Sequence, residues 1–80
     1  MKYRRKPVEV EAIRWLGDNT EEVIDFCGNG AYYIPRSSYI EIPTRTGALR
    51  AVPGNFIVRD ERNEFLIYST KMFIETFESI

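Results

Sequence analysis

The last third of the chain carries the pattern that most constrains its fold. A Pro-Gly pair at residues 53–54 is followed by an apolar run at residues 56–58, and the polar residues 59–64 separate this run from a second one at residues 65–68. Pro-Gly favours a type II turn, in which the glycine takes a positive φ without strain. Two short apolar runs joined by a polar segment predict a β-hairpin. We therefore expect Gly54 at a left-handed turn position and an antiparallel strand pair after it.

The alternation within this hairpin predicts which side chains face the core. Successive side chains of a strand point to opposite faces, and directly paired residues share a face. The residues expected to face the core are Phe56, Val58, Phe65 and Ile67, and those expected on the other face are Ile57 and Arg59.

The first half of the chain predicts one strand and the main helix. Residues 8–15 alternate as in a strand, but the phase changes near Ala12, which indicates a bulge there or a strand end covered on both faces. The helix is expected over Asn19–Cys27, with Asn19 or Asp18 as its cap. Glu22 completes a capping box with Asn19, and the helix ends at Gly28.

The middle and the end of the chain predict further short elements. Strands are expected at residues 31–34, 39–42 and 48–52, with a hairpin turn at residues 44–47. Ser69 can start a turn of helix near the end. Residues 74–78 then alternate as in a strand, although Phe73 and Phe77 have helical spacing, and their β-branched content favours the strand.

Together these elements predict an α+β fold in a single domain of residues 1–80. We expect a curved, mostly antiparallel sheet or a small open barrel, with one main helix at Asn19–Cys27 and a short C-terminal helical turn. The predicted core comprises Val10, Ile13, Trp15, Val23, Ile24, Ile40, Ile42, Leu49, Phe56, Val58, Phe65, Ile67 and Phe73.

The size and charge of the chain narrow its partners. Eighty residues with one cysteine can form no intrachain disulfide, and so small a core covers eleven aromatic residues poorly, so we expect a homo-oligomer. A net charge of −1 argues against general nucleic-acid binding. No apolar run approaches the roughly 20 residues of a membrane span, and the basic residues 2–6 lack the apolar run of a signal peptide, which predicts a cytoplasmic protein.

The sequence offers little catalytic chemistry. The chain has no histidine, which removes histidine-based nucleophile pairs and metal sites. Cys27 lies on the apolar stripe of the predicted helix, where a buried hydrophobic role is expected. Two pairs of acids, Glu9 with Glu11 and Glu61 with Glu64, are equally typical of exposed surface, and the glycines at positions 28 and 30 follow a helix and so form no phosphate loop. We expect no enzyme activity, no metal and no cofactor.

One segment combines basic and aromatic residues. Between positions 29 and 59, four arginines face a single acid, Glu41. Guanidinium groups bind phosphate bidentately, and tyrosine can stack on a base or donate a hydrogen bond. The candidate ligand-binding residues are Arg36, Arg45, Arg50, Tyr32, Tyr33, Tyr39 and Thr46. We expect the three arginines to converge on a pocket, within one chain or between subunits; a solvated sheet face and a widened core are the structural alternatives.

The whole chain resembles a group of small, uncharacterised phage and prophage proteins. The opening residues 2–12 (KYRRKPVEVEA) are similar to that family's first strand, residues 15–19 (WLGDN) follow as in the family, and residues 53–58 (PGNFIV) resemble its late Pro-Gly-Asp-aromatic hairpin. Two departures are that Asn55 replaces the usual aspartate, and that residues 60–63 (DERN) replace a glycine-containing turn.

The resemblance implies a non-enzymatic phage accessory protein in the host cytoplasm. Combined with the arginine and tyrosine residues, it suggests a counter-defence protein that binds and sequesters a small anionic ligand, such as a nucleotide immune signal. The alternative is a protein-binding inhibitor of a host factor, or a virion assembly accessory protein, that acts through a sheet edge or an aromatic patch.

Overall fold

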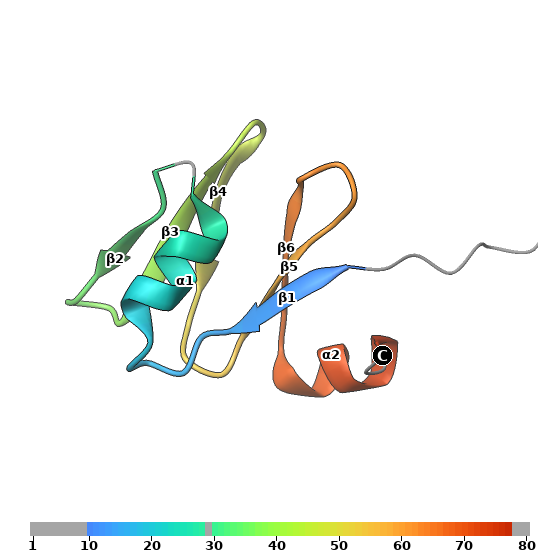
Figure 1. Cartoon of the computed structure of the whole chain (residues 1–80). Coiled ribbons are helices and arrows are strands. Elements are labelled where there is room, and N and C mark those ends of the chain that lie inside the picture. Colours follow the sequence, from blue (N-terminus) through green and yellow to red (C-terminus); the bar gives the residue numbers. More distant parts are fainter. Residues whose placement is uncertain (1–9, 29, 78–80) are drawn as a thin grey trace, which may run out of the picture.

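A computed structural model describes residues 10–28 and 30–77 of the chain, which form two helices and two antiparallel sheets of three strands each (Figure 1). In chain order the elements are β1 (Glu11–Arg14), α1 (Thr20–Cys27), β2 (Tyr32–Ile34), β3 (Tyr39–Thr44), β4 (Gly47–Ala51), β5 (Phe56–Arg59), β6 (Phe65–Tyr68) and α2 (Thr70–Thr76). The strand orders are β1-β5-β6 and β2-β3-β4. The expected α+β fold is confirmed, and its strands divide between two sheets that do not close into a barrel.

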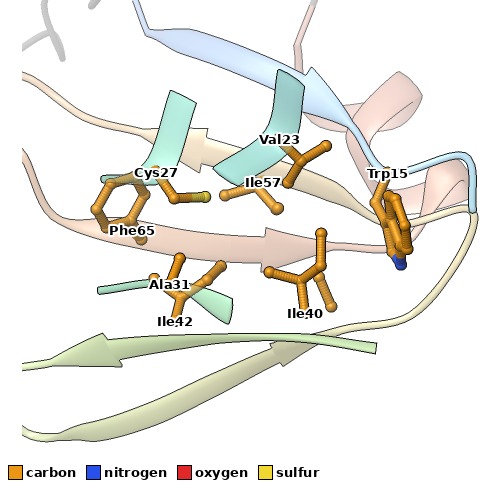
Figure 2. Packing of buried hydrophobic residues seen from close by; sticks show 9 residues of the cluster. Trp15, Val23, Cys27, Ala31, Ile40, Ile42, Ile57 and Phe65 are labelled. Carbon is orange, nitrogen blue, oxygen red and sulfur yellow. The ribbon is translucent and has the colours of Figure 1, made fainter. Parts of the chain in front are cut away.

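The main core lies between α1 and the two sheets (Figure 2). Six of the expected core residues are buried, and these are Trp15, Val23, Ile40, Ile42, Val58 and Phe65. Ile13, Leu49 and Ile67 pack against the core while partly exposed. Cys27 is buried as expected, whereas the burial of Ala31, Ala51 and Ile57 was not expected from the sequence. Ala31 and Ala51 are small and lie outside a strand or at its end, where alternation gives little information.

The predicted orientation of β5 is wrong, although Phe65 and Ile67 of β6 face the main core as expected. Ile57 pairs with Ile67 and is fully buried in the main core, whereas Phe56 pairs with Tyr68 on the other face. Val58 is nevertheless only 1% exposed, so both faces of β5 are covered. Arg59 lies on the Ile57 face, where its guanidinium donates to the carbonyl oxygen of Phe26 near the end of α1 at 2.8 Å.

The β1 strand is shorter than expected and contains no bulge. Its register with β5 runs without interruption from Glu11 opposite Arg59 to Arg14 opposite Phe56. The phase change in the sequence arises because Ile13 faces the main core and Trp15, just past the strand, is fully buried. The predicted strand residues 8 and 9 lie outside the described residues.

Helix α1 begins where expected, but its cap differs from the predicted capping box. Asn19 occupies the N-cap position, but its side chain accepts from no helix N–H group. Its Oδ1 instead accepts from the Leu16 N–H at 2.8 Å, and its Nδ2 donates to the Arg14 carbonyl at 2.9 Å and to Glu22 Oε1 at 3.4 Å. The Asn19 side chain therefore stabilises the connection between β1 and α1, and not the first turn of the helix.

The turn at residues 52–55 confirms the opening prediction. Gly54 has φ 99°, and the Asn55 N–H donates to the Val52 carbonyl at 3.0 Å. Asn55 Oδ1 accepts from the Val52 N–H at 3.0 Å, a bond that an aspartate at this position would also accept. The Gly54 N–H and the Asn55 carbonyl form backbone hydrogen bonds with Trp15 at 2.7 and 2.9 Å. The turn is thus fixed on both sides.

The C-terminal segment is a helix, and the predicted strand over residues 74–76 is wrong. Ser69 caps α2 by accepting from the Met72 N–H at 3.2 Å. Phe73 and Phe77, one helical turn apart, contact aromatic rings of the sheet: Phe73 stacks on Phe56, and Phe77 meets the Tyr68 ring edge-on at 5.2 Å. These contacts and the cap outweigh the β-branched preference. The end of the predicted strand, residue 78, lies outside the described residues.

Candidate functional site

The candidate residues of the second sheet are divided between its two faces. The register pairs Tyr32 with Glu41 and Glu41 with Arg50, so these three side chains form a row across β2, β3 and β4. Ile40 and Ile42, which alternate with Glu41, are fully buried in the core. The Tyr32–Glu41–Arg50 row therefore lies on the outer face of the sheet.

The charges of this outer row balance within it, because Glu41 and Arg50 form an ion pair. Glu41 accepts from the Tyr32 hydroxyl and, at 3.2 Å, from Arg50 Nε, and the Arg50 guanidinium lies 5.2 Å from the centre of the Tyr39 ring. The hydrogen bond donated by Tyr32, and to a lesser extent the one donated by Arg50, lowers the pKa of the Glu41 carboxyl below its usual value. The bond between Tyr32 and Glu41 also raises the pKa of the Tyr32 hydroxyl. Because Arg50 already has a carboxylate partner, this face offers little free positive charge to an anion.

Two further candidate residues lie away from this row. Tyr33 alternates with Tyr32 and points inward, where its ring meets Trp15 edge-on with the centroids 5.7 Å apart. Arg36 lies in the turn at residues 35–38 between β2 and β3. The structure therefore gives Tyr33 a packing role and places Arg36 at the end of β3 opposite to Arg45.

The remaining candidates, Arg45 and Thr46, line a groove at the other end of the molecule. Figure 1 shows that the tips of the β3–β4 and β5–β6 hairpins lie at the same end of the molecule. The residues that line the groove come from both hairpins. The groove has a volume of about 690 Å³. Its lining residues are Pro43, Thr44, Arg45, Thr46, Leu49, Arg62, Asn63, Glu64, Phe65 and Leu66. Within one chain the three candidate arginines thus do not converge. Of the three, Arg45 lines the groove, and Arg36 and Arg50 do not.

The β5–β6 turn holds three polar residues at the groove. Asp60 Oδ1 accepts from the N–H groups of Arg62 and Glu64 at 2.8 and 2.9 Å. Asn63 takes the left-handed conformation with φ 60°, which asparagine tolerates better than most residues. The sequence analysis missed Arg62, because only the placement of the two sheets brings this residue near Arg45.

An ion pair connects the two tips across the groove. Arg45 Nη2 lies 3.3 Å from Glu64 Oε1, and the two side chains are 87% and 53% exposed. In the described ranges 10–28 and 30–77, the other ion pairs join Arg50 to Glu41 and Arg59 to Glu11. Arg62 belongs to none of these pairs, so its guanidinium is available at the rim.

The rest of the described structure contains few reactive groups. Burial raises the pKa of the Cys27 thiol to about 11, although the nearby Arg59 acts in the opposite direction. Residues 10–28 and 30–77 contain no group of three or more side chains that could hold a metal ion. No helix in these ranges is long and apolar enough to cross a membrane.

The groove combines features suited to a small anion with an apolar part. Arg45 and Arg62 supply guanidinium groups, Thr46 and Asn63 supply neutral hydrogen-bonding groups, and Leu49 supplies apolar surface. Comparison with protein-family models, with curated proteins and with solved structures finds no match for this chain.

Proposed function

We propose that this protein is a non-enzymatic phage accessory protein that binds and sequesters a small anionic ligand, such as a nucleotide immune signal, in the groove between the hairpin tips. The observation that carries the proposal is the pairing of a concave site with two arginines. Its volume of about 690 Å³ lies within the roughly 300–1,000 Å³ typical of small-molecule sites.

The groove lining suits the two halves of a nucleotide. The guanidinium groups of Arg45 and Arg62 can bind phosphate oxygens bidentately. Leu49 and Pro43 offer apolar surface on which a base or sugar can rest. Glu64, the acid among the lining residues, is paired with Arg45, and the chain has no histidine to act as a second proton-transfer group. Binding without chemical change therefore accounts for this lining.

Calorimetry with a panel of nucleotides tests the proposal. Arg45→Ala and Arg62→Ala are each expected to weaken binding more than about tenfold, because a hydrogen bond to a charged group contributes about 1.5–3 kcal/mol. Arg36→Ala is the matched control, since Arg36 lies at the opposite end of β3 and outside the groove. It should bind like the parent. All three variants should melt like the parent, and failure of the parent to bind any nucleotide would remove the proposal.

A second candidate function rests on the outer face of β2–β3–β4. On this face Tyr32 is 46% exposed and the Arg50 side chain is 64% exposed. Such a surface suits a protein partner, as an inhibitor or assembly factor would require. A photo-crosslinking residue in place of Ala48 should then capture one host or virion protein in infected cells, whereas the same residue in place of Glu61 should not. Equal capture at the two positions would count against this function.

A further inference from the structure

The ion pair across the groove places an acid in competition with any ligand anion. Arg45 lies in the turn between β3 and β4, and Glu64 directly precedes β6, so the pair joins hairpins of different sheets. Both residues also line the groove. A ligand that binds the Arg45 guanidinium bidentately must therefore compete with the Glu64 carboxylate.

Glu64 keeps its position without help from Arg45. Its N–H donates to Asp60 Oδ1 at 2.9 Å, and its carbonyl accepts from the Asp60 N–H at 3.0 Å. The preceding residue, Asn63, fixes the turn with φ 60°. When Arg45 moves to a ligand, the Glu64 backbone is thus expected to stay at the rim of the groove, with its carboxylate close to the incoming charge.

We propose that Glu64 is a built-in competitor that makes the groove selective for ligands whose anionic group carries two negative charges. This inference rests on the proposed function of the groove. A singly charged group only replaces the Glu64 carboxylate as the anionic partner of Arg45, so the net gain in binding free energy is small. A doubly charged group, such as a phosphomonoester, also binds Arg62, which belongs to none of the ion pairs within residues 10–28 and 30–77. Within residues 10–28 and 30–77, no ion-paired acid offsets this second contact.

The competitor is weak enough to be displaced. An ion pair with side chains 87% and 53% exposed is screened by water, and such pairs are among the weakest in proteins. Glu64→Gln is therefore expected to tighten binding by only about two- to fivefold. The pair lowers the affinity of the groove without closing it.

Calorimetry with two adenine nucleotides tests the inference. Adenosine 5′-monophosphate is mostly doubly charged at neutral pH, whereas adenosine 3′,5′-cyclic monophosphate carries a single charge on the same base and sugar. The parent protein should bind the 5′-monophosphate at least about tenfold more tightly, because the second charge adds a hydrogen-bonded contact with Arg62. Glu64→Gln should bind both nucleotides more tightly. Glu61→Gln removes the same charge from the same turn but outside the groove lining, and should bind like the parent.

A double-mutant cycle separates competition for Arg45 from general repulsion. The gain from Glu64→Gln should persist in an Arg62→Ala background and largely disappear in an Arg45→Ala background. Equal affinities for Glu64→Gln and Glu61→Gln would overturn the competitor, and equal affinities of the parent for the two nucleotides would overturn the charge selectivity. If the parent binds other nucleotides, the proposed function survives either result. If neither the parent nor Glu64→Gln binds any nucleotide, both the inference and the proposed function fail.

Discussion

The ring of Phe73 lies flat on the ring of Phe56, with the two centroids 3.9 Å apart and the planes inclined by 3°. Phe56 is therefore the residue on which α2 docks, on the face of β5 opposite to the main core. Arg14 adds to this contact from the neighbouring strand, with its guanidinium 5.6 Å from the centre of the Phe56 ring. The stack favours a helical C-terminal segment. It also covers part of the Phe56 ring, which lies outside the main core and is therefore only partly buried.

Replacement of Ile57 should destabilise the protein more than replacement of Phe56. Ile57→Ala leaves a cavity at a fully buried position and is expected to cost about 2–5 kcal/mol. Phe56→Ala should cost less than the roughly 3–5 kcal/mol of a fully buried phenylalanine, because its ring is partly exposed. Urea unfolding followed by circular dichroism measures both values. A larger loss for Phe56→Ala would mean that the α2 contact, and not the core between the sheets, dominates stability.

Gly54→Val should destabilise the 52–55 turn through the backbone alone. A valine side chain would meet no atom within 4 Å of its Cβ, but the residue would have to adopt φ 99°. Left-handed backbone costs an ordinary residue about 1–2 kcal/mol, and a β-branched residue is especially disfavoured there. Ala48→Val, on the exposed part of an edge strand, is the control that should melt like the parent. Equal melting temperatures for Gly54→Val and the parent would contradict the turn assignment.

The Glu41 carboxyl should titrate at an unusually low pH. The hydrogen bonds from Tyr32 and Arg50 lower its pKa in the folded protein, so the row stabilises the fold above the unfolded pKa of about 4.3. This contribution is lost as the pH falls through the lower folded pKa. NMR titration of the carboxyl carbon should show the pKa rising toward the ordinary value in Tyr32→Phe. Tyr39→Phe, which removes a hydroxyl not bonded to Glu41, should leave it lower than in Tyr32→Phe.

The Cys27 thiol should react slowly in the folded protein. With a pKa of about 11, roughly one thiol in a thousand is ionised at about pH 8, and the side chain is also buried. Labelling with a maleimide should therefore be at least about a hundredfold slower in buffer than in denaturant. Similar rates under the two conditions would place Cys27 on an accessible surface and reopen a reactive role for it.

The protein should sediment as an oligomer at micromolar concentration. Several large apolar side chains are about half exposed or more in the single chain, and these are Leu16, Tyr32, Val52, Leu66, Met72 and Ile74. Association would bury part of this surface. We expect a mass above the 9.4 kDa of one chain. A sharp monomer boundary at every concentration would contradict the prediction, and Val52→Asp provides a variant that should weaken any interface that buries this exposed side chain.

Local chemistry made part of the fold predictable. The turn at Pro53 and Gly54 depends on only four adjacent residues. The start of α1 at Asn19 is likewise determined by neighbouring residues. The orientation of β5 was not predictable in this way. Ile57 and Val58 are adjacent and both buried, so alternation fits either face, and the location of α2 is needed to decide between them.

The candidate site shows the same division. A segment rich in arginine and tyrosine drew attention to Arg45 and Thr46, and both residues line the groove. It could not show that Arg50 would be paired by Glu41, because that contact depends on the register of β3 and β4. Nor could it include Arg62, which lies in the other sheet's hairpin and approaches Arg45 only through the packing of the two sheets.

The position of Trp15 provides an optical probe of how the protein unfolds. The indole N–H donates to the Ser38 carbonyl at 3.4 Å in one sheet region, while the Trp15 backbone bonds the turn that leads into β5 in the other. Trp15 is the single tryptophan of the chain, so its emission wavelength reports on water entering between the two sheets and not on the fraying of α2. Ellipticity, which includes α2, would then fall at lower denaturant than the fluorescence change if this terminal helix melts as a separate unit.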